Sequence, residues 1–65
     1  ETVKMQDAIY VLEFKMNGTA EEALAQINSK GYAIPYEADH RKVVKVGINF
    51  DSTTRTIGDW EIETD

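Results

Sequence analysis

Residues 8–16 alternate in the way that a β-strand requires. The even positions are all apolar: Tyr10, Leu12, Phe14 and Met16. The odd positions begin apolar and end charged: Ile9, Val11, Glu13 and Lys15. Because successive side chains of a strand point to opposite faces, this pattern predicts a strand covered on both faces that emerges into a cleft at its C-terminal end.

A helix is predicted to follow a turn at residues 17–18. Thr19 and Glu22 have the spacing of a capping box, in which a hydroxyl and a carboxylate satisfy free backbone N–H groups. Apolar side chains then recur at helical spacing, at Ala20, Ala23, Leu24 and Ile27. Lys30 falls in the last turn, and Gly31 suits the left-handed residue that ends a helix. The apolar stripe is narrow and rich in alanine, which favours close packing on a sheet.

Two further strands are predicted after a connection over residues 32–39, which holds the only proline. Residues 42–50 alternate apolar side chains with a mixed set, residues 51–53 have turn chemistry, and residues 54–63 form the last strand. Residues 1–5 are expected to be the frayed end of an earlier strand.

These elements predict an α+β or α/β fold in which strand, helix, strand and strand build a mixed sheet with one flanking helix. The first two strands are expected to be parallel across a right-handed crossover, and the last to pair antiparallel as a hairpin. With 65 residues the chain makes at most one domain.

The charge balance argues against unaided binding to a phosphate backbone. The chain has seven Lys and Arg residues and 12 Asp and Glu residues, which gives a net charge of −5. Acidic residues alternate near the C-terminus and predict a solvated strand face: Asp59, Glu61, Glu63 and Asp65. The chain has no cysteine, which fits a reducing, cytoplasmic setting, and no apolar stretch approaches the roughly 18 residues of a membrane helix.

Glu13 and Lys15 carry the strongest indication of chemistry. Two residues apart on a strand, they share one face at roughly 6.6 Å along the chain, either as a surface ion pair or as part of a site. The other reactive side chains have ordinary interpretations. His40 is expected in a solvated loop, Trp60 and the tyrosines in the core and in strand pairs, and residues 51–53 in a turn.

Three segments are distinctive when taken together: residues 10–15, 18–27 and 30–33. With residues 41–44, 46–51 and 60–62, they resemble the PD-(D/E)XK nuclease superfamily. The resemblance is to the nuclease-like domain that follows an AAA-type ATPase-like domain in bacterial proteins. It implies a restriction-endonuclease-like mixed sheet and a nucleic acid as the partner of the complete domain.

The same resemblance implies residue roles. Glu13 would ligate Mg²⁺ or Mn²⁺, with the Phe14 carbonyl as a further contact, and Lys15 would act as the base or electrostatic partner. Gln26 matches a substrate-side glutamine on the next helix, with Tyr32 or Tyr36 as phosphate-side contacts. The related motif places a tyrosine where this chain has a lysine, at position 30.

The family's upstream Asp has no counterpart, because neither Glu1 nor Asp7 stands where that acid belongs. Residues 1–65 are therefore expected to be a partial domain, its C-terminal part, that binds Mg²⁺ weakly and is inactive alone. The alternative is a non-catalytic interaction or dimerisation module that uses the same sheet, as a homo-oligomer through an uncovered edge. A third hypothesis, recognition of nucleic acid without cleavage, is disfavoured by the acidic balance.

Overall fold

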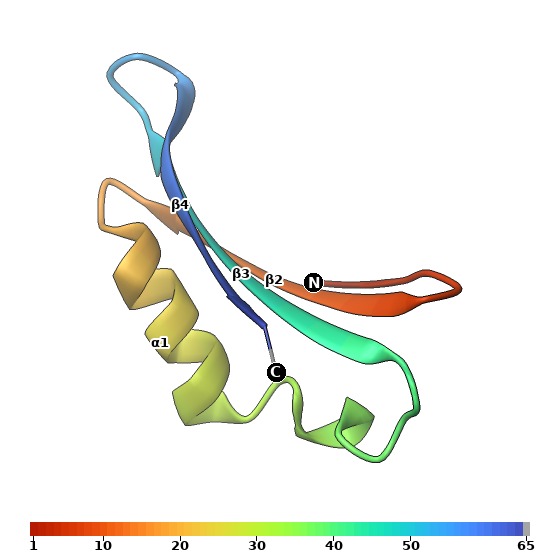
Figure 1. Ribbon diagram of the computed structural model, residues 1–65. Coiled ribbons are helices and arrows are strands. Elements are labelled where there is room, and N and C mark those ends of the chain that lie inside the picture. Colours follow the sequence, from red (N-terminus) through yellow and green to blue (C-terminus); the bar gives the residue numbers. More distant parts are fainter. Residues whose placement is uncertain (65) are drawn as a thin grey trace.

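The chain folds into a four-stranded mixed sheet with one helix on one of its sides (Figure 1). The structure is a computed structural model that describes residues 1–64. Its elements are β1 (Thr2–Lys4), β2 (Ala8–Met16), α1 (Ala20–Lys30), the 3-10 helix η1 (Ile34–Tyr36), β3 (Lys42–Asp51) and β4 (Thr56–Thr64). The strands lie in the order β1-β2-β3-β4, with β2 and β3 parallel and the two outer pairs antiparallel. The predicted mixed sheet with a flanking helix is confirmed.

The ends of the sheet differ from the prediction in detail. Residues 1–5 contain β1, which pairs with β2 only as far as the Thr2 and Val11 partners. The backbone of Glu1 also bonds to Leu12. After Leu12, no strand of the described chain pairs with the outer edge of β2, so its C-terminal end has an open edge. At the other hairpin the turn runs to Arg55, which adopts a left-handed backbone, so β4 begins two residues later than expected.

The core lies between α1 and the sheet face formed by odd positions of β2 and β3. Its buried members are Ile9, Val11, Ile27, Ala33 and Val43, with Leu24 and Tyr36 packed against them. Gly47 on β3 allows the helix to approach closely. A Cβ at this position would lie 2.6 Å from the backbone N of Leu24 and closer still to the carbonyl of Ala20, so α1 lies directly on the backbone of β3.

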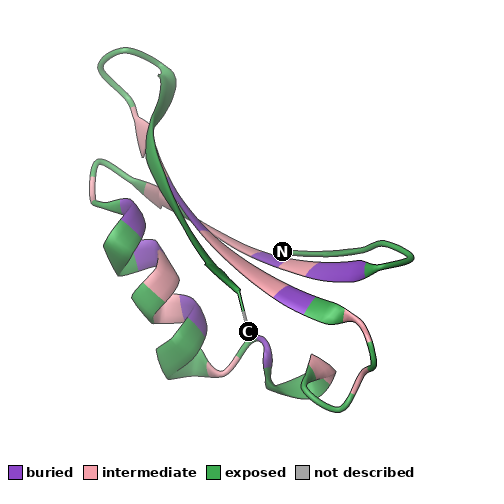
Figure 2. Cartoon of the chain, in the orientation of Figure 1, coloured by how far each residue is buried: buried purple, intermediate pink, exposed green. Residues whose placement is uncertain are grey.

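The opposite face of the sheet is apolar and, within residues 1–64, no helix covers it (Figure 1). Phe14 is 55% exposed and Trp60 is 63% exposed, and β4 is exposed along its length (Figure 2). The prediction that β2 is covered on both faces is therefore wrong for the described chain, as is the core position expected for Trp60. Trp60 does form the expected strand pair, with Ile48. Alternation identifies an apolar face but does not identify what covers it.

The helix has 11 residues. No helix in the described part of the chain is long and apolar enough to cross a membrane.

Candidate functional site

Side chains from the two C-terminal strands hold the start of α1. Thr19 accepts a hydrogen bond from the backbone N of Glu22 at 3.0 Å, as a capping residue does. The Glu22 carboxylate accepts from the Thr19 hydroxyl at 3.1 Å, so the expected box forms through the hydroxyl. Asn49 accepts from the backbone N of Gly18 at 2.9 Å, and Asp59 accepts from that of Ala20 at 3.2 Å. These bonds fix α1 beside the C-terminal half of β2.

Glu13 and Lys15 both occupy the helix side of β2. Gln26, on α1, contacts this acid: with the side-chain amide turned so that its NH₂ group faces acceptors and its oxygen faces donors, Nε2 donates to Glu13 Oε2 at 3.2 Å. Its Oε1 then accepts from Lys30 Nζ at 3.1 Å. Gln26 therefore contacts both Glu13 on β2 and Lys30 on its own helix.

A groove runs between α1 and the open edge of β2. It has a volume of about 450 Å³ and is lined by Lys15, Glu22, Ala25, Gln26, Ser29 and Lys30. Glu13 lies beside this groove through its bond to Gln26. The open edge of β2 leaves this groove shallow and accessible from solvent.

Glu13 and Glu22 are the two acids at this place, and the Glu22 carboxylate accepts from the Thr19 hydroxyl in the capping box. Among residues 1–64, no group of three or more His, Cys, Asp or Glu side chains stands together as a metal site. Glu1 pairs with Leu12, so its side chain points to the face opposite Glu13. Mg²⁺ binds through one or two carboxylates together with water and substrate oxygens. Glu13 has the chemistry of one such carboxylate.

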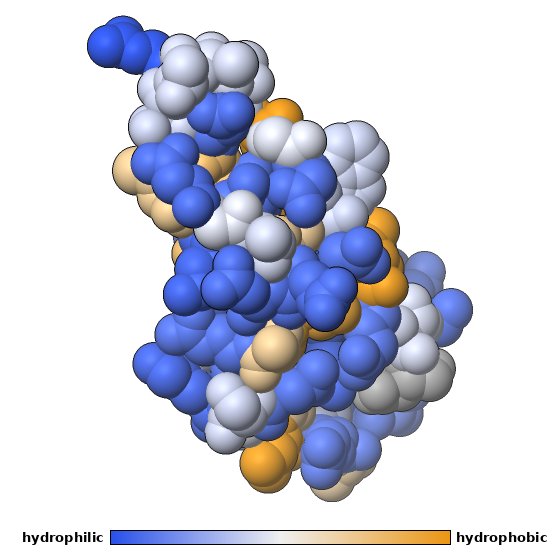
Figure 3. All heavy atoms as spheres, turned by 90° about the vertical axis from the view of Figure 1, so that its left-hand side faces the viewer, coloured by the Kyte–Doolittle hydropathy of each residue, from blue (hydrophilic) through white to orange (hydrophobic). Residues whose placement is uncertain are grey.

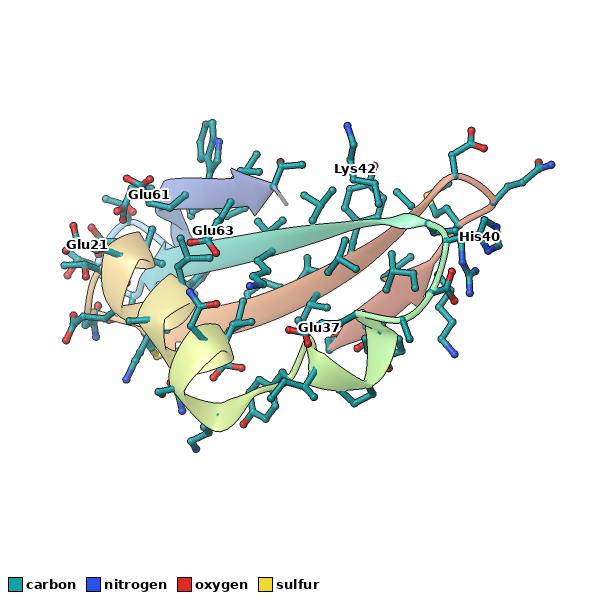
Figure 4. The ribbon with its side chains drawn as sticks, turned by 60° about the horizontal axis from the view of Figure 1, so that its bottom comes forward. Glu21, Glu37, His40, Lys42, Glu61 and Glu63 are labelled. Atoms are coloured by element: carbon teal, nitrogen blue, oxygen red, sulfur yellow. The ribbon has the colours of Figure 1, made fainter. Side chains whose placement is uncertain are left out.

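The remaining candidates lie elsewhere. Tyr36 packs against the core, and Tyr32 does not line the groove, so the structure offers no support for either as a phosphate-side contact. His40 is in a loop with its side chain 90% exposed, as expected. It lies at the end of the molecule opposite Glu21 at the start of α1 (Figure 4).

A second polar cluster stabilises that far end. Arg41 donates to both carboxylate oxygens of Asp39, at 2.9 and 2.7 Å, and to the Met5 carbonyl at 3.3 Å. Side-chain hydrogen bonds from Arg41 hold the pKa of Asp39 well below its ordinary value. Because these contacts join the loop to the turn before β2, the cluster has a structural role.

The sequence pattern indicated no role in the site for Lys30, and it predicted that Asp59 and Glu63 are solvated. Lys30 is one helical turn after Gln26, and this spacing of four residues was the available signal. Asp59 instead binds the helix start, and Glu63 accepts from Lys45 at 3.4 Å, so both acids contact their neighbours. Asp65 lies outside the described residues.

The model of the PD-(D/E)XK nuclease superfamily matches residues 1–60. No curated protein and no solved structure matches the chain. The family match covers both Glu13 and Lys15, together with α1 and β3. The chain therefore belongs to the PD-(D/E)XK nuclease superfamily.

Proposed function

We propose that this chain carries the Glu13 and Lys15 half of a nuclease centre, and that the complete domain hydrolyses phosphodiester bonds with Mg²⁺ or Mn²⁺. The observation that supports it is the position of the two side chains. Both stand on the helix side of β2, beside an open groove, and Gln26 contacts the acid. A surface ion pair would explain neither the shared groove nor the glutamine, and Lys15 forms no ion pair with Glu13 in the described chain.

Each residue has a separate role in this proposal. Glu13 would hold the cation through its carboxylate, which Gln26 orients by donating to Oε2. Lys15 offers a positive charge to the phosphate oxygens, where negative charge grows during hydrolysis. A bound divalent ion supplies Lewis acidity and lowers the pKa of a water molecule.

We also propose that residues 1–65 are only part of the catalytic domain. One carboxylate holds Mg²⁺ weakly, so residues 1–65 alone should not cleave nucleic acid at a useful rate. From the resemblance to nuclease-like domains, we further propose that the domain belongs to a bacterial, cytoplasmic protein, in which it follows an AAA-type ATPase-like domain.

Titration with Mn²⁺ tests the site. The paramagnetic ion should broaden the NMR signals of Glu13 and Lys15 first, and Glu13→Gln should remove this selectivity. Glu61→Gln is the matched control, because Glu61 is an exposed acid on β4 and should leave the broadening unchanged. Broadening spread evenly over the acidic surface would contradict the metal role. Robust metal-dependent cleavage by these 65 residues that Glu13→Ala abolishes would contradict the partial-domain part.

A second candidate function is self-association through the uncovered sheet face. Six of its large side chains are 43 to 65% exposed: Val3, Phe14, Met16, Ile57, Trp60 and Ile62. Since the two aromatic side chains present about 150 to 250 Å² each and the other four somewhat less, these six together expose on the order of several hundred Å². A stable interface buries roughly 800 Å² per partner, and the face includes further apolar side chains between these six. By contrast, the side that α1 presents is mostly hydrophilic (Figure 3).

Two copies would bury these faces against each other as packed sheets. Analytical ultracentrifugation should then give a dimer at micromolar concentration, and Trp60→Lys a monomer. Tyr32→Lys is the control, because Tyr32 is 40% exposed away from this face. A monomeric parent chain, or a dimer that Trp60→Lys does not affect, would contradict self-association. The groove lies on the other side of the sheet, so both functions can coexist.

A further inference from the structure

The groove beside β2 holds two lysines whose charges are not compensated by ion pairs. Among residues 1–64, the ion pairs involve His40, Arg41 and Lys45. Lys15 and Lys30 are therefore both without a carboxylate partner, although both line the groove. Glu22 is the one acid among the lining residues, and its carboxylate accepts from the Thr19 hydroxyl.

Lys30 is held in place by a neutral group. Its Nζ donates to Gln26 Oε1 at 3.1 Å, and the same amide donates to Glu13 at 3.2 Å. The amide thus fixes the ammonium relative to Glu13 without neutralising it. An anion that enters the groove would meet a cation that is already oriented, which reduces the entropy lost on binding.

We infer that Lys30 is an anion-binding residue of this site, which takes a phosphate oxygen of a nucleic-acid strand lying along the groove. The inference rests on the proposed function, and it assigns to Lys30 a contact separate from those of Glu13 and Lys15. The chain as a whole is acidic, with a net charge of −5. Binding of a polyanion therefore needs local cations, and Lys15 and Lys30 are those of this groove, with Glu22 in the lining and Glu13 beside it.

A simpler role for Lys30 is stabilisation of α1, because a cation in the last turn interacts favourably with the helix dipole. That role predicts lower stability for Lys30→Gln and no change in oligonucleotide binding. The anion-binding role predicts a change in binding and in its salt dependence. The two roles therefore separate in a binding titration.

The experiment is fluorescence anisotropy with a labelled single-stranded oligonucleotide, titrated at several salt concentrations. Lys30→Gln should weaken binding several-fold at low salt and reduce the slope of log K against log salt by about 0.7, the value for one phosphate contact on a single strand. Lys30→Arg keeps the charge and should restore most of the affinity. Lys42→Gln is the matched control: Lys42 is exposed on β3, at the opposite end of the molecule from Glu21 (Figure 4), and its loss should change the affinity less than twofold.

Equal effects of Lys30→Gln and Lys42→Gln would overturn the inference, as would the absence of binding by the parent chain. The proposed function has a separate readout. If selective Mn²⁺ broadening at Glu13 persists while Lys30→Gln has no effect, the role of Lys30 fails and the metal site stands. If the broadening fails while Lys30→Gln still weakens binding, the nuclease proposal fails and a phosphate contact remains.

Discussion

The carboxylate of Asp59 on β4 accepts a hydrogen bond from the backbone N–H of Ala20, the first residue of α1, at 3.2 Å. The two residues are 39 positions apart in the sequence. An acid at this place satisfies a free backbone donor and interacts favourably with the positive end of the helix dipole. One acid of the C-terminal strand therefore acts as a remote cap for the helix that borders the groove.

Asp59→Ala should lower the free energy of unfolding by about 0.5 to 2 kcal/mol, the range for loss of a capping side chain. Asp59→Asn keeps an acceptor and should cost less. Urea unfolding followed by circular dichroism measures both. Glu61→Ala is the control, since Glu61 is an exposed acid of the same strand, and an equal loss in Asp59→Ala and Glu61→Ala would contradict the capping role.

Close contact between α1 and β3 depends on Gly47. A methyl group there would meet the backbone of Leu24 and Ala20, which cannot rotate away as a side chain can. Gly47→Ala should therefore lower the free energy of unfolding by about 1 to 3 kcal/mol, as overpacking does. Urea unfolding again measures the change.

Gly58→Ala on β4 gives the matched comparison for this test. A Cβ at position 58 would have its nearest neighbours at 3.4 Å or more, so this variant should lose much less stability than Gly47→Ala. If both variants lost the same amount, the cost would come from the glycine backbone and not from contact with the helix.

Much of this fold could be predicted from local sequence patterns. Alternation placed β2 and β3, and the Thr19 cap with Gly31 placed the ends of α1. The parallel pairing of β2 and β3 followed from the helix between them. These features depend on neighbouring residues, which a sequence displays directly.

Contacts between distant residues could not be predicted in this way. The bond between Asp59 and Ala20 depends on which strand lies beside the start of the helix, and spacing along the chain does not contain that information. The uncovered sheet face could not be predicted for the same reason. Alternation shows that Trp60 is on an apolar face, but it does not show whether another element packs there. Glu13 and Lys15 could be proposed as site residues because they are close in sequence, whereas the contact between Gln26 and Lys30 needed the structure.

The pair of Asp39 and Arg41 should make stability depend on pH at the acid end. Hydrogen bonds from Arg41 lower the pKa of Asp39 in the folded chain below the ordinary 3.8. Because the unfolded chain takes up the proton first as pH falls, the stabilisation is complete above about pH 5 and is lost as pH falls below 3.8.

The stability difference between the parent chain and Asp39→Asn should thus be constant near neutral pH and shrink in acid. Urea midpoints measured across this range test it. Arg41→Gln removes the partner and should reproduce the same shrinking difference. If this stability difference stayed constant down to the lowest pH measured, the ion pair with Arg41 would not set the pKa of Asp39.

The contact between Gln26 and Glu13 allows a direct test of the single-carboxylate site. Gln26→Glu would place a second carboxylate where the amide now lies, 3.2 Å from Glu13 Oε2. The new acid would be repelled by Glu13 but attracted by Lys30, whose Nζ lies 3.1 Å from the present amide oxygen, so the stability of the metal-free variant should change by less than roughly 1 kcal/mol. Because ion affinity rises with the charge of the ligands, Mn²⁺ should bind about tenfold more tightly and stabilise the variant.

Gln26→Met is the control for this design, because it removes the hydrogen bond without adding charge. Its Mn²⁺ affinity should equal or fall below that of the parent chain, as Glu13 loses the group that orients it. Calorimetric titration with Mn²⁺ gives both affinities. If Gln26→Glu bound no more tightly than Gln26→Met, Glu13 would not be a metal ligand at this groove, because a second acid beside a true ligand must raise the affinity.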